Sequence, residues 1–167
     1  PVLVNFMPNL PGVMKAWKGL KVYYCVDRWD AFGRYDSAMM AKMDEDCCRH
    51  ADQVIASSND LYERCVKLNP NTHLVTHGVD HKHFSAILNN QSHSRPSDLP
   101  DGKVVGFIGL LSEWVNQDLI VKLAHELDDS HIVLIGKADV SIDRVRRENN
   151  IHILGPKPFA ELPAYVA

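Results

Sequence analysis

A short β-branched run that stops at a glycine and is followed by a helical pattern constrains this chain more than any other feature. Residues 104–108 are typical of a buried strand that ends at Gly109, and residues 114–127 have the apolar spacing of a helix. Strand, glycine turn and helix form half of a βαβ unit. In that unit the N–H groups of the first helical turn point out of the carboxyl end of the sheet, which predicts an anion site over Gly109–Ser112. The alternative is a turn that binds nothing.

Composition and charge exclude several classes of protein. The chain has 167 residues, of which 46% are hydrophobic and 23% charged, and its net charge is −3. This is an ordinary soluble composition, and Lys and Arg do not cluster, so no nucleic-acid partner is expected. The longest nearly continuous apolar run, residues 104–111, is too short to span a membrane.

The four cysteines have no metal-binding or disulfide pattern. They are Cys25, Cys47, Cys48 and Cys65, and none forms a CxxC pair. We expect buried, reduced thiols in a cytoplasmic protein rather than a disulfide framework or a zinc site.

Strand and helix patterns alternate along the chain and are interrupted once. Leu88–Gly102 is polar and has no apolar period, so it predicts a linker. The expected fold is α/β with parallel sheets, in two Rossmann-like lobes over residues 1–87 and 103–167, both incomplete. Strands are expected at 1–7, 21–26, 53–56, 73–76, 103–108, 131–135 and 151–154, and helices at 35–51, 57–68, 114–127, 141–148 and from about Phe159, with a short helical turn near 14–17.

The expected helix at 35–51 has an apolar stripe. Met39, Met43 and Cys47 recur at helical spacing, with Met40 and Ala51 on the flank, and Asp36 or Ser37 can cap the helix. We interpret the methionines as core residues rather than a cofactor site.

Three glycines follow three expected strands of the second lobe. Gly109, Gly136 and Gly155 would lie along one carboxyl edge of a parallel sheet and form a ledge where a ligand approaches the backbone. Lys137 and Lys157 stand beside two of them and could bind phosphate. The alternative is that glycine is simply favoured where strands end.

Polar residues at strand ends of the first lobe are further candidates. Asp27 and Asp30 follow the strand at 21–26 and could serve as a base or accept sugar hydroxyls, although such residues often only cap the next segment. The closely spaced His73, His77, His81 and His83 are a weak zinc candidate, above all His77, His81 and His83, because several of these positions are typical of exposed turns.

The order of these motifs resembles bacterial glycosyltransferases of the GT-B fold, in the "glycosyl transferases group 1" class and closest to its polysaccharide-biosynthesis branch. The resemblance spans nearly the whole chain. It rests on VYYCVDRWDAF (22–32), HADQVIASSNDLYE (50–63), THGVDHKHF (76–84), GFIGLLSEWVNQDLI (106–120), HIVLIG (131–136) and NIHILGPKPFAELPAYVA (150–167).

The resemblance implies a metal-free transfer of a sugar from a UDP- or GDP-linked donor, with retention at the anomeric carbon, to a saccharide or lipid-linked acceptor. It implies a cytoplasmic protein, at most peripherally associated with the inner face of a membrane. The second lobe would hold the donor, and the first would face the acceptor. The implied donor residues are Gly109, Leu110, Leu111, Ser112, Gly136, Lys137, Gly155, Lys157 and Pro158, and the implied acceptor-side residues are Asp27, Asp30, Ser57 and Ser58.

The chain departs from the family pattern at several positions. Leu110 and Val115 stand where many relatives have Arg and Lys, so the usual cations for the diphosphate are missing there, and His77 replaces the usual Asn. The acidic E-x7-E segment of the family would lie beyond Ala167, and its first strands would precede Pro1. The chain therefore resembles the middle of an enzyme and is expected to be inactive alone. A non-catalytic nucleotide-sugar binding module and a nucleotide-sugar epimerase of the same fold are the alternatives.

Overall fold

The computed structural model describes residues 1–89 and 95–166. The chain divides into two compact units, Pro1–Gly78 and Val79–Ala167. The division comes before residue 87, where the sequence placed the end of the first lobe, and residues 90–94 of the predicted linker lie outside the described residues. Within the described residues, no helix combines the length and the apolar character that crossing a membrane requires.

An unpredicted helix accounts for the earlier division. Helix α4 (His81–Asn89) belongs to the second unit and packs against α6 (Leu162–Val166). Asp80 Oδ1 accepts a hydrogen bond from His83 N at 3.0 Å, and the His83 ring stacks on Phe159 at 4.5 Å between centroids. No helix was expected at residues 81–89, although Asp80 is a residue type that favours the start of a helix.

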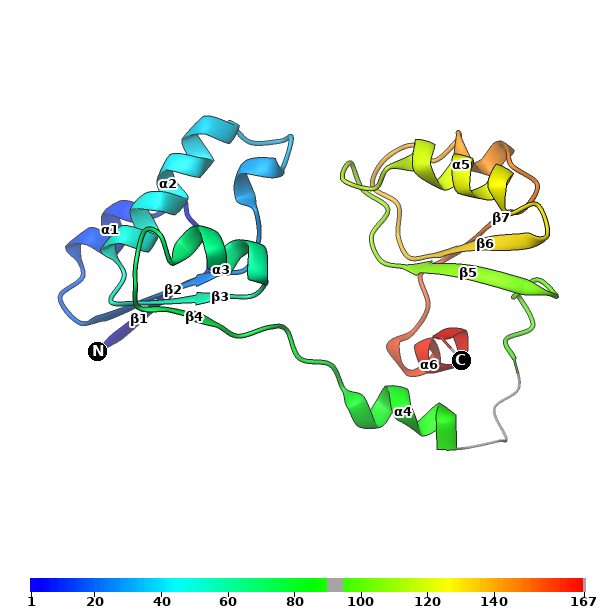
Figure 1. The fold of residues 1–167 in the computed structure, drawn as a ribbon, viewed down its shortest axis with the longest axis horizontal. Coiled ribbons are helices and arrows are strands. Elements are labelled where there is room, and N and C mark those ends of the chain that lie inside the picture. The colour runs from blue at the N-terminus through cyan, green and yellow to red at the C-terminus, as the bar shows by residue number, and fades with distance from the viewer. Residues whose placement is uncertain (90–94, 167) are drawn as a thin grey trace. The chain divides into compact units, whose positions relative to one another are not determined.

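The first unit has a four-stranded parallel sheet with α1, α2 and α3 on one face (Figure 1). The strands lie in the order β1-β2-β3-β4, and every neighbouring pair is parallel, as predicted. The elements are β1 (Val2–Asn5), α1 (Pro11–Ala16), β2 (Leu20–Cys25), the 3-10 turn η1 (Trp29–Ala31), α2 (Ser37–His50), β3 (Gln53–Ala56), α3 (Asn59–Cys65) and β4 (Thr72–Leu74).

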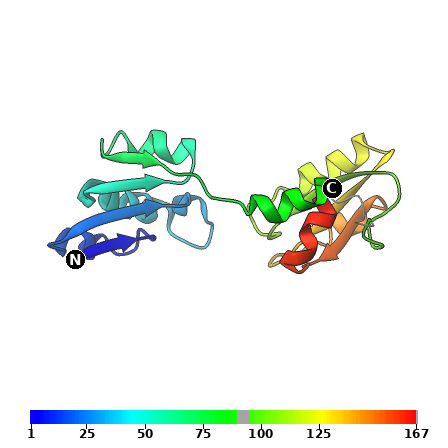
Figure 2. The ribbon, with the colours of Figure 1, turned by 90° about the horizontal axis from the view of Figure 1, so that it is seen from below.

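The core of the first unit lies between the sheet and its helices. Tyr23 and Cys25 of β2 and Val54 and Ala56 of β3 are fully buried, as the alternation of side chains along a strand requires. The other face, toward the viewer in Figure 2, has no helix over it among the described residues, and Val2 is 59% exposed. In the described part of the chain this unit therefore has two layers.

The buried face of α2 is turned by one residue from the predicted face. Met40, Asp44, Cys47 and Cys48 are buried, whereas Met39 is 50% exposed. The stripe predicted through Met39, Met43 and Cys47 is therefore wrong in register. The true stripe carries a carboxylate, which an apolar pattern does not reveal.

The buried carboxylate of Asp44 has partners from two other elements. Tyr23 Oη of β2 donates a hydrogen bond to Asp44 Oδ1 at 2.5 Å, and Arg64 of α3 forms an ion pair with Oδ2. Burial raises the pKa of Tyr23, so its phenol stays protonated and remains a donor. Asp44 thus connects a strand and two helices inside the core.

The second unit has a three-stranded parallel sheet in the order β5-β6-β7. Helix α5 covers one face, and α4 and α6 lie on the side of the other (Figure 1). Its elements besides α4 and α6 are β5 (Lys103–Ile108), α5 (Gln117–Glu126), β6 (Ser130–Ile135), the 3-10 turns η2 (Val145–Arg147) and η3 (Phe159–Glu161), and β7 (Ile151–Gly155). The predicted strands are present in this unit too, but the expected burial of residues 104–108 is wrong: β5 is an edge strand of the described sheet, and Val105 and Ile108 are 39% and 41% exposed.

Two helices of the second unit differ from their predicted bounds. Helix α5 begins at Gln117 rather than at residue 114, because Asn116 caps it by accepting from Leu119 N at 3.0 Å. The helix predicted at 141–148 is reduced to the single turn η2. Ser141 Oγ bonds the Asp143 carboxylate at 2.8 Å, and such local side-chain bonds compete with helix formation.

Removing the Asp44 carboxylate should destabilise the first unit strongly. Asp44→Ala leaves Arg64 and Tyr23 without their buried partner, and we expect a loss of about 3 kcal/mol. The neighbouring Glu45→Ala is the control, because Glu45 forms a surface ion pair with the exposed Arg49 and its removal should cost under about 0.5 kcal/mol. Urea unfolding followed by hydrogen-exchange mass spectrometry reports each unit separately. Equal losses in the two variants would contradict a structural role for the buried pair.

The second unit should lose stability in mild acid. Burial, aided by the nearby His131, lowers the pKa of His152, whose Nε2 lies 3.0 Å from His131 Nδ1. Because the pKa of His152 is lower in the folded than in the unfolded state, the unfolded state binds the proton more readily. The free energy of unfolding is therefore highest above the unfolded-state pKa of about 6.5 and falls as the pH drops below it. We expect His152→Gln to flatten this dependence in hydrogen exchange of β6 and β7, and the exposed His81→Gln to leave it unchanged. An unaltered profile in His152→Gln would refute the assignment.

Candidate functional site

The three strand-end glycines of the second unit lie side by side. Gly109 N donates to Ile135 O at 2.9 Å, and Gly136 N donates to Gly155 O at 3.0 Å. A Cβ on Gly136 would lie 1.8 Å from Gly109 O, and Gly136 has a φ of 145°. No other residue fits this position, because a side chain would collide with backbone and the conformation disfavours L residues. We call this backbone surface, formed by Gly109, Gly136 and Gly155, the glycine ledge.

The segment after Gly109 continues along the sheet rather than entering a helix. Leu111 N donates to Lys137 O at 2.9 Å, and Asp139 N donates to Leu111 O at 3.1 Å. Leu111 and Ser112 are each 2% exposed, and Leu110 is 39% exposed. α5 starts only at Gln117 instead of residue 114, so its first turn is farther along the chain from residues 109–112 than the geometric prediction assumed. Donor contact by these residues remains a prediction.

The two lysines beside the ledge have different surroundings. Lys137 is exposed. Lys157 forms an ion pair with Asp98, whose Oδ1 also accepts from Tyr165 Oη at 3.0 Å. The hydrogen bond to Asp98 raises the pKa of Lys157, and the same bond lowers that of Asp98. A phosphate would have to compete with Asp98 for Lys157, whereas the structure gives no ion pair for Lys137 among the described residues.

Sequence reasoning missed Asp98 and Tyr165. Asp98 falls within the predicted linker, and it is 59 residues from Lys157 in sequence. No periodic pattern links positions so far apart. The acidic side chain of Asp98 in a polar stretch was the one feature of the sequence that could have indicated a contact.

Three of the four acceptor-side candidates in the first unit have structural partners. Asp30 receives two hydrogen bonds from Arg28, at 3.0 and 2.8 Å, and this interaction lowers its pKa. Ser57 Oγ donates to Val26 O at 2.9 Å, and Ser58 caps α3. Asp27 is exposed, and its contact with an acceptor stays a prediction.

The histidines predicted as a weak zinc candidate do not form a metal site in the described structure. His73 Nε2 bonds Gln53 Oε1 at 2.7 Å, and His83 Nε2 bonds Phe159 O at 2.9 Å. Across residues 1–89 and 95–166, no group of three or more His, Cys, Asp or Glu side chains is arranged to hold a metal. His77 and His81 therefore belong to no such group in this part of the chain.

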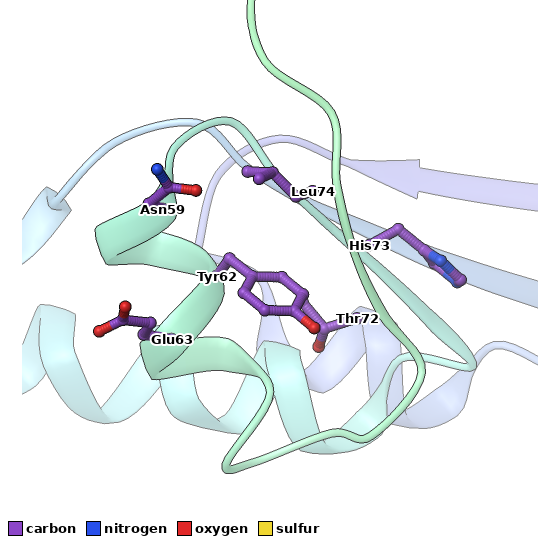
Figure 3. Close-up of a pocket in the computed structure, with 6 residues that line it drawn as sticks. All are labelled: Asn59, Tyr62, Glu63, Thr72, His73 and Leu74. Atoms are coloured by element: carbon purple, nitrogen blue, oxygen red, sulfur yellow. The ribbon is translucent and has the colours of Figure 1, made fainter.

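An open pocket of about 600 Å³ lies between α3 and β4. Figure 3 shows Tyr62 extending toward Thr72, while His73 points away from both. Thr72 Oγ1 already donates to Asn69 O at 2.5 Å. The pocket is lined by Asn59, Tyr62, Glu63, Thr72, His73 and Leu74, without Lys or Arg, so it offers no cation to a phosphate.

Comparison with known proteins identifies the fold. No protein-family model and no curated protein sequence matches the chain. The crystal structure of HepE from Anabaena in complex with UDP and glucose matches it with a TM-score of 0.57 and 19% identity. The match covers 87% of this chain and 43% of HepE, so the chain spans less than half of that protein. The predicted fold class, two Rossmann-like parallel-sheet lobes of GT-B type, is confirmed.

A side chain at Gly136 should disrupt the ledge. We expect Gly136→Ala to cost the second unit about 3 kcal/mol, because it combines collision with Gly109 O and backbone strain. Gly106→Ala is the matched control: a Cβ on Gly106 in β5 has no atom within 4 Å, so the change should stay within about 1 kcal/mol. Hydrogen exchange of β6 amides in urea measures both. A Gly136→Ala variant as stable as Gly106→Ala would contradict the close backbone approach.

Proposed function

We propose that this chain is the central part of a glycosyltransferase that uses a nucleotide-sugar donor. The single observation that supports it most is the glycine ledge, at the edge where ligands of parallel α/β sheets bind. The likeness to a structure that contains UDP and glucose supports the same ligand class. The donor would be UDP- or GDP-linked and the acceptor a saccharide or a lipid-linked saccharide.

The ledge suits a diphosphate for steric and electrostatic reasons. Three positions without side chains let the ligand approach the backbone closely, and the exposed Lys137 adds a positive charge next to Gly136. The segment Gly155–Pro158 would lie against the base, as the family resemblance implies. Lys157 would join the donor site only by leaving Asp98.

The proposed reaction needs no metal and retains the configuration at the anomeric carbon. The bond from that carbon to the diphosphate oxygen breaks, and its electron pair leaves with the diphosphate. An acceptor oxygen forms the new bond, and its proton passes to a base. Lys137 would stabilise the charge on the leaving diphosphate. The enzyme would work in the cytoplasm, at the inner face of the membrane where a lipid-linked acceptor is used.

One observation favours a second candidate function, a nucleotide-sugar binding module without catalysis. Leu110 stands where many relatives of the resembled family carry Arg, and it offers no charge to the leaving group. Lys157, the other nearby cation, is paired with Asp98. Such a module would bind the donor on the same glycine ledge without catalysing transfer of the sugar.

Titration of the chain with UDP, followed by amide NMR, tests the binding site. We expect the amide signals of Gly109, Gly136 and Gly155 to shift, and Lys137→Ala to weaken binding about tenfold, because one charge-assisted contact to phosphate is lost. Lys122→Ala, which removes an exposed lysine from α5, is the matched control and should bind as the parent chain does. GDP is titrated in the same way, and the proposal is refuted if neither nucleotide at millimolar concentration shifts the ledge signals, or if the shifts are confined to the first unit.

Turnover separates the candidates once binding is established. Because the chain is expected to be inactive alone, UDP-glucose and GDP-linked sugars are incubated with the full-length protein, with and without saccharide acceptors, and the products are separated by chromatography. A new glycoside supports the transferase, and binding without any product supports the module. Conversion of free nucleotide sugar without an acceptor would indicate an epimerase instead.

A further inference from the structure

We propose that Cys48 and Cys65 form an oxidation site, at which a peroxide joins the two thiols in a reversible disulfide inside the first unit. Cys48 Sγ lies 3.5 Å from Cys65 Sγ. The two residues come from different helices, α2 and α3, and both are fully buried. The inference concerns the core of the first unit and is independent of the proposed function.

One residue, Asn69, connects the backbone segments that carry the two cysteines. Asn69 Nδ2 donates to Cys48 O at 2.9 Å and to Ala51 O at 2.8 Å, while Asn69 N donates to Cys65 O at 2.9 Å. The end of α2 and the end of α3 are therefore fixed to the same residue. This arrangement keeps the two thiols together and gives each a high effective concentration toward the other.

The neighbouring thiols are less suited to the reaction. Cys47 follows the same helix, but its Sγ contacts Pro8 O at 3.6 Å and Asn5 Nδ2 at 3.5 Å instead of another sulfur. Cys25 also forms a hydrogen bond with Cys65, but its Sγ lies beside the charged pair, 3.8 Å from both Asp44 Oδ1 and Arg64 Nη2. Among the four free cysteines, Cys65 therefore has two thiol neighbours, and Cys48 is the one that lies away from the charged pair.

The chemistry balances with hydrogen peroxide as the oxidant. One thiolate attacks a peroxide oxygen, the O–O bond breaks, and a sulfenic acid and one water form. The second thiol then attacks the sulfenic sulfur, the S–S bond forms, and a second water leaves. Both sulfurs are oxidised by one electron each, and the peroxide is reduced by two. A dithiol reductant reverses the step by thiol–disulfide exchange.

Burial should make the reaction slow rather than prevent it. The hydrogen bond with Cys25 lowers the pKa of Cys65, but the bond with Cys48 and burial outweigh it and raise the pKa to about 12. The thiolate fraction is therefore small near neutral pH, and peroxide must enter through local opening of the core. The rate should consequently rise about tenfold for each unit of pH.

The chain is treated with hydrogen peroxide, digested without reduction and mapped by mass spectrometry. We expect a Cys48–Cys65 cross-linked peptide, loss of two hydrogens from the intact mass, a fall from four to two titratable thiols in denaturant, and return to four after dithiothreitol. The oxidised first unit should melt several degrees higher, because the cross-link restricts its unfolded state.

Variants sharpen the test. Cys47→Ser should cross-link as the parent chain does, and Cys65→Ser should not. Because the parent chain is mapped directly, the result does not depend on the folding of Cys65→Ser. Four remaining thiols, a Cys25–Cys65 or Cys47–Cys48 bond as the main product, or stable sulfinic acid at Cys65 would each overturn the proposal.

Discussion

The close approach of Gly136 to the carbonyl of Gly109 is the constraint on which the second unit and its candidate site depend. Parallel pairing brings the ends of β5, β6 and β7 to one edge, and the hydrogen bonds from Gly109 to Ile135 and from Gly136 to Gly155 hold the strand ends in register. The space that a ligand needs is created by the absence of side chains. The same residues are therefore responsible for both the packing of the edge and its openness, and neither can change without the other.

The first unit is organised by a different interaction. Asp44 draws β2, α2 and α3 together through Tyr23 and Arg64, and the polar contacts lie within a core of buried cysteines and small residues. A buried ion pair of this kind is expensive to break, although it is no stronger than an apolar core of the same shape. It sets which face of α2 points inward, and it lies beneath the strand whose end carries Asp27.

The sequence allowed the sheets to be predicted well and the helices less well. β-branched runs that stop at glycine define β5 and β6 almost to the residue. β6 is buried, as such a run predicts, whereas β5 lies at the edge of the described sheet and is partly exposed. The predicted buried face of α2 was wrong because adjacent residues such as Met39 and Met40 fit two apolar stripes equally well. Only the tertiary partners of Asp44 decide which of the two stripes is buried. The three glycines were found by their shared position after strands, whereas the contact of Lys157 with Asp98 depends on tertiary structure that no local pattern encodes.

The two-layer construction of the first unit has a thermodynamic consequence. In the part of the chain that the structure describes, helices cover one face of the β1–β4 sheet, and side chains such as Val2 and Val4 on the first strand stay largely hydrated in the native state. Unfolding then transfers less apolar surface to water than it would in a three-layer unit of equal length. The heat-capacity change should be correspondingly small, which gives a flat stability curve with a weak dependence on temperature around its maximum.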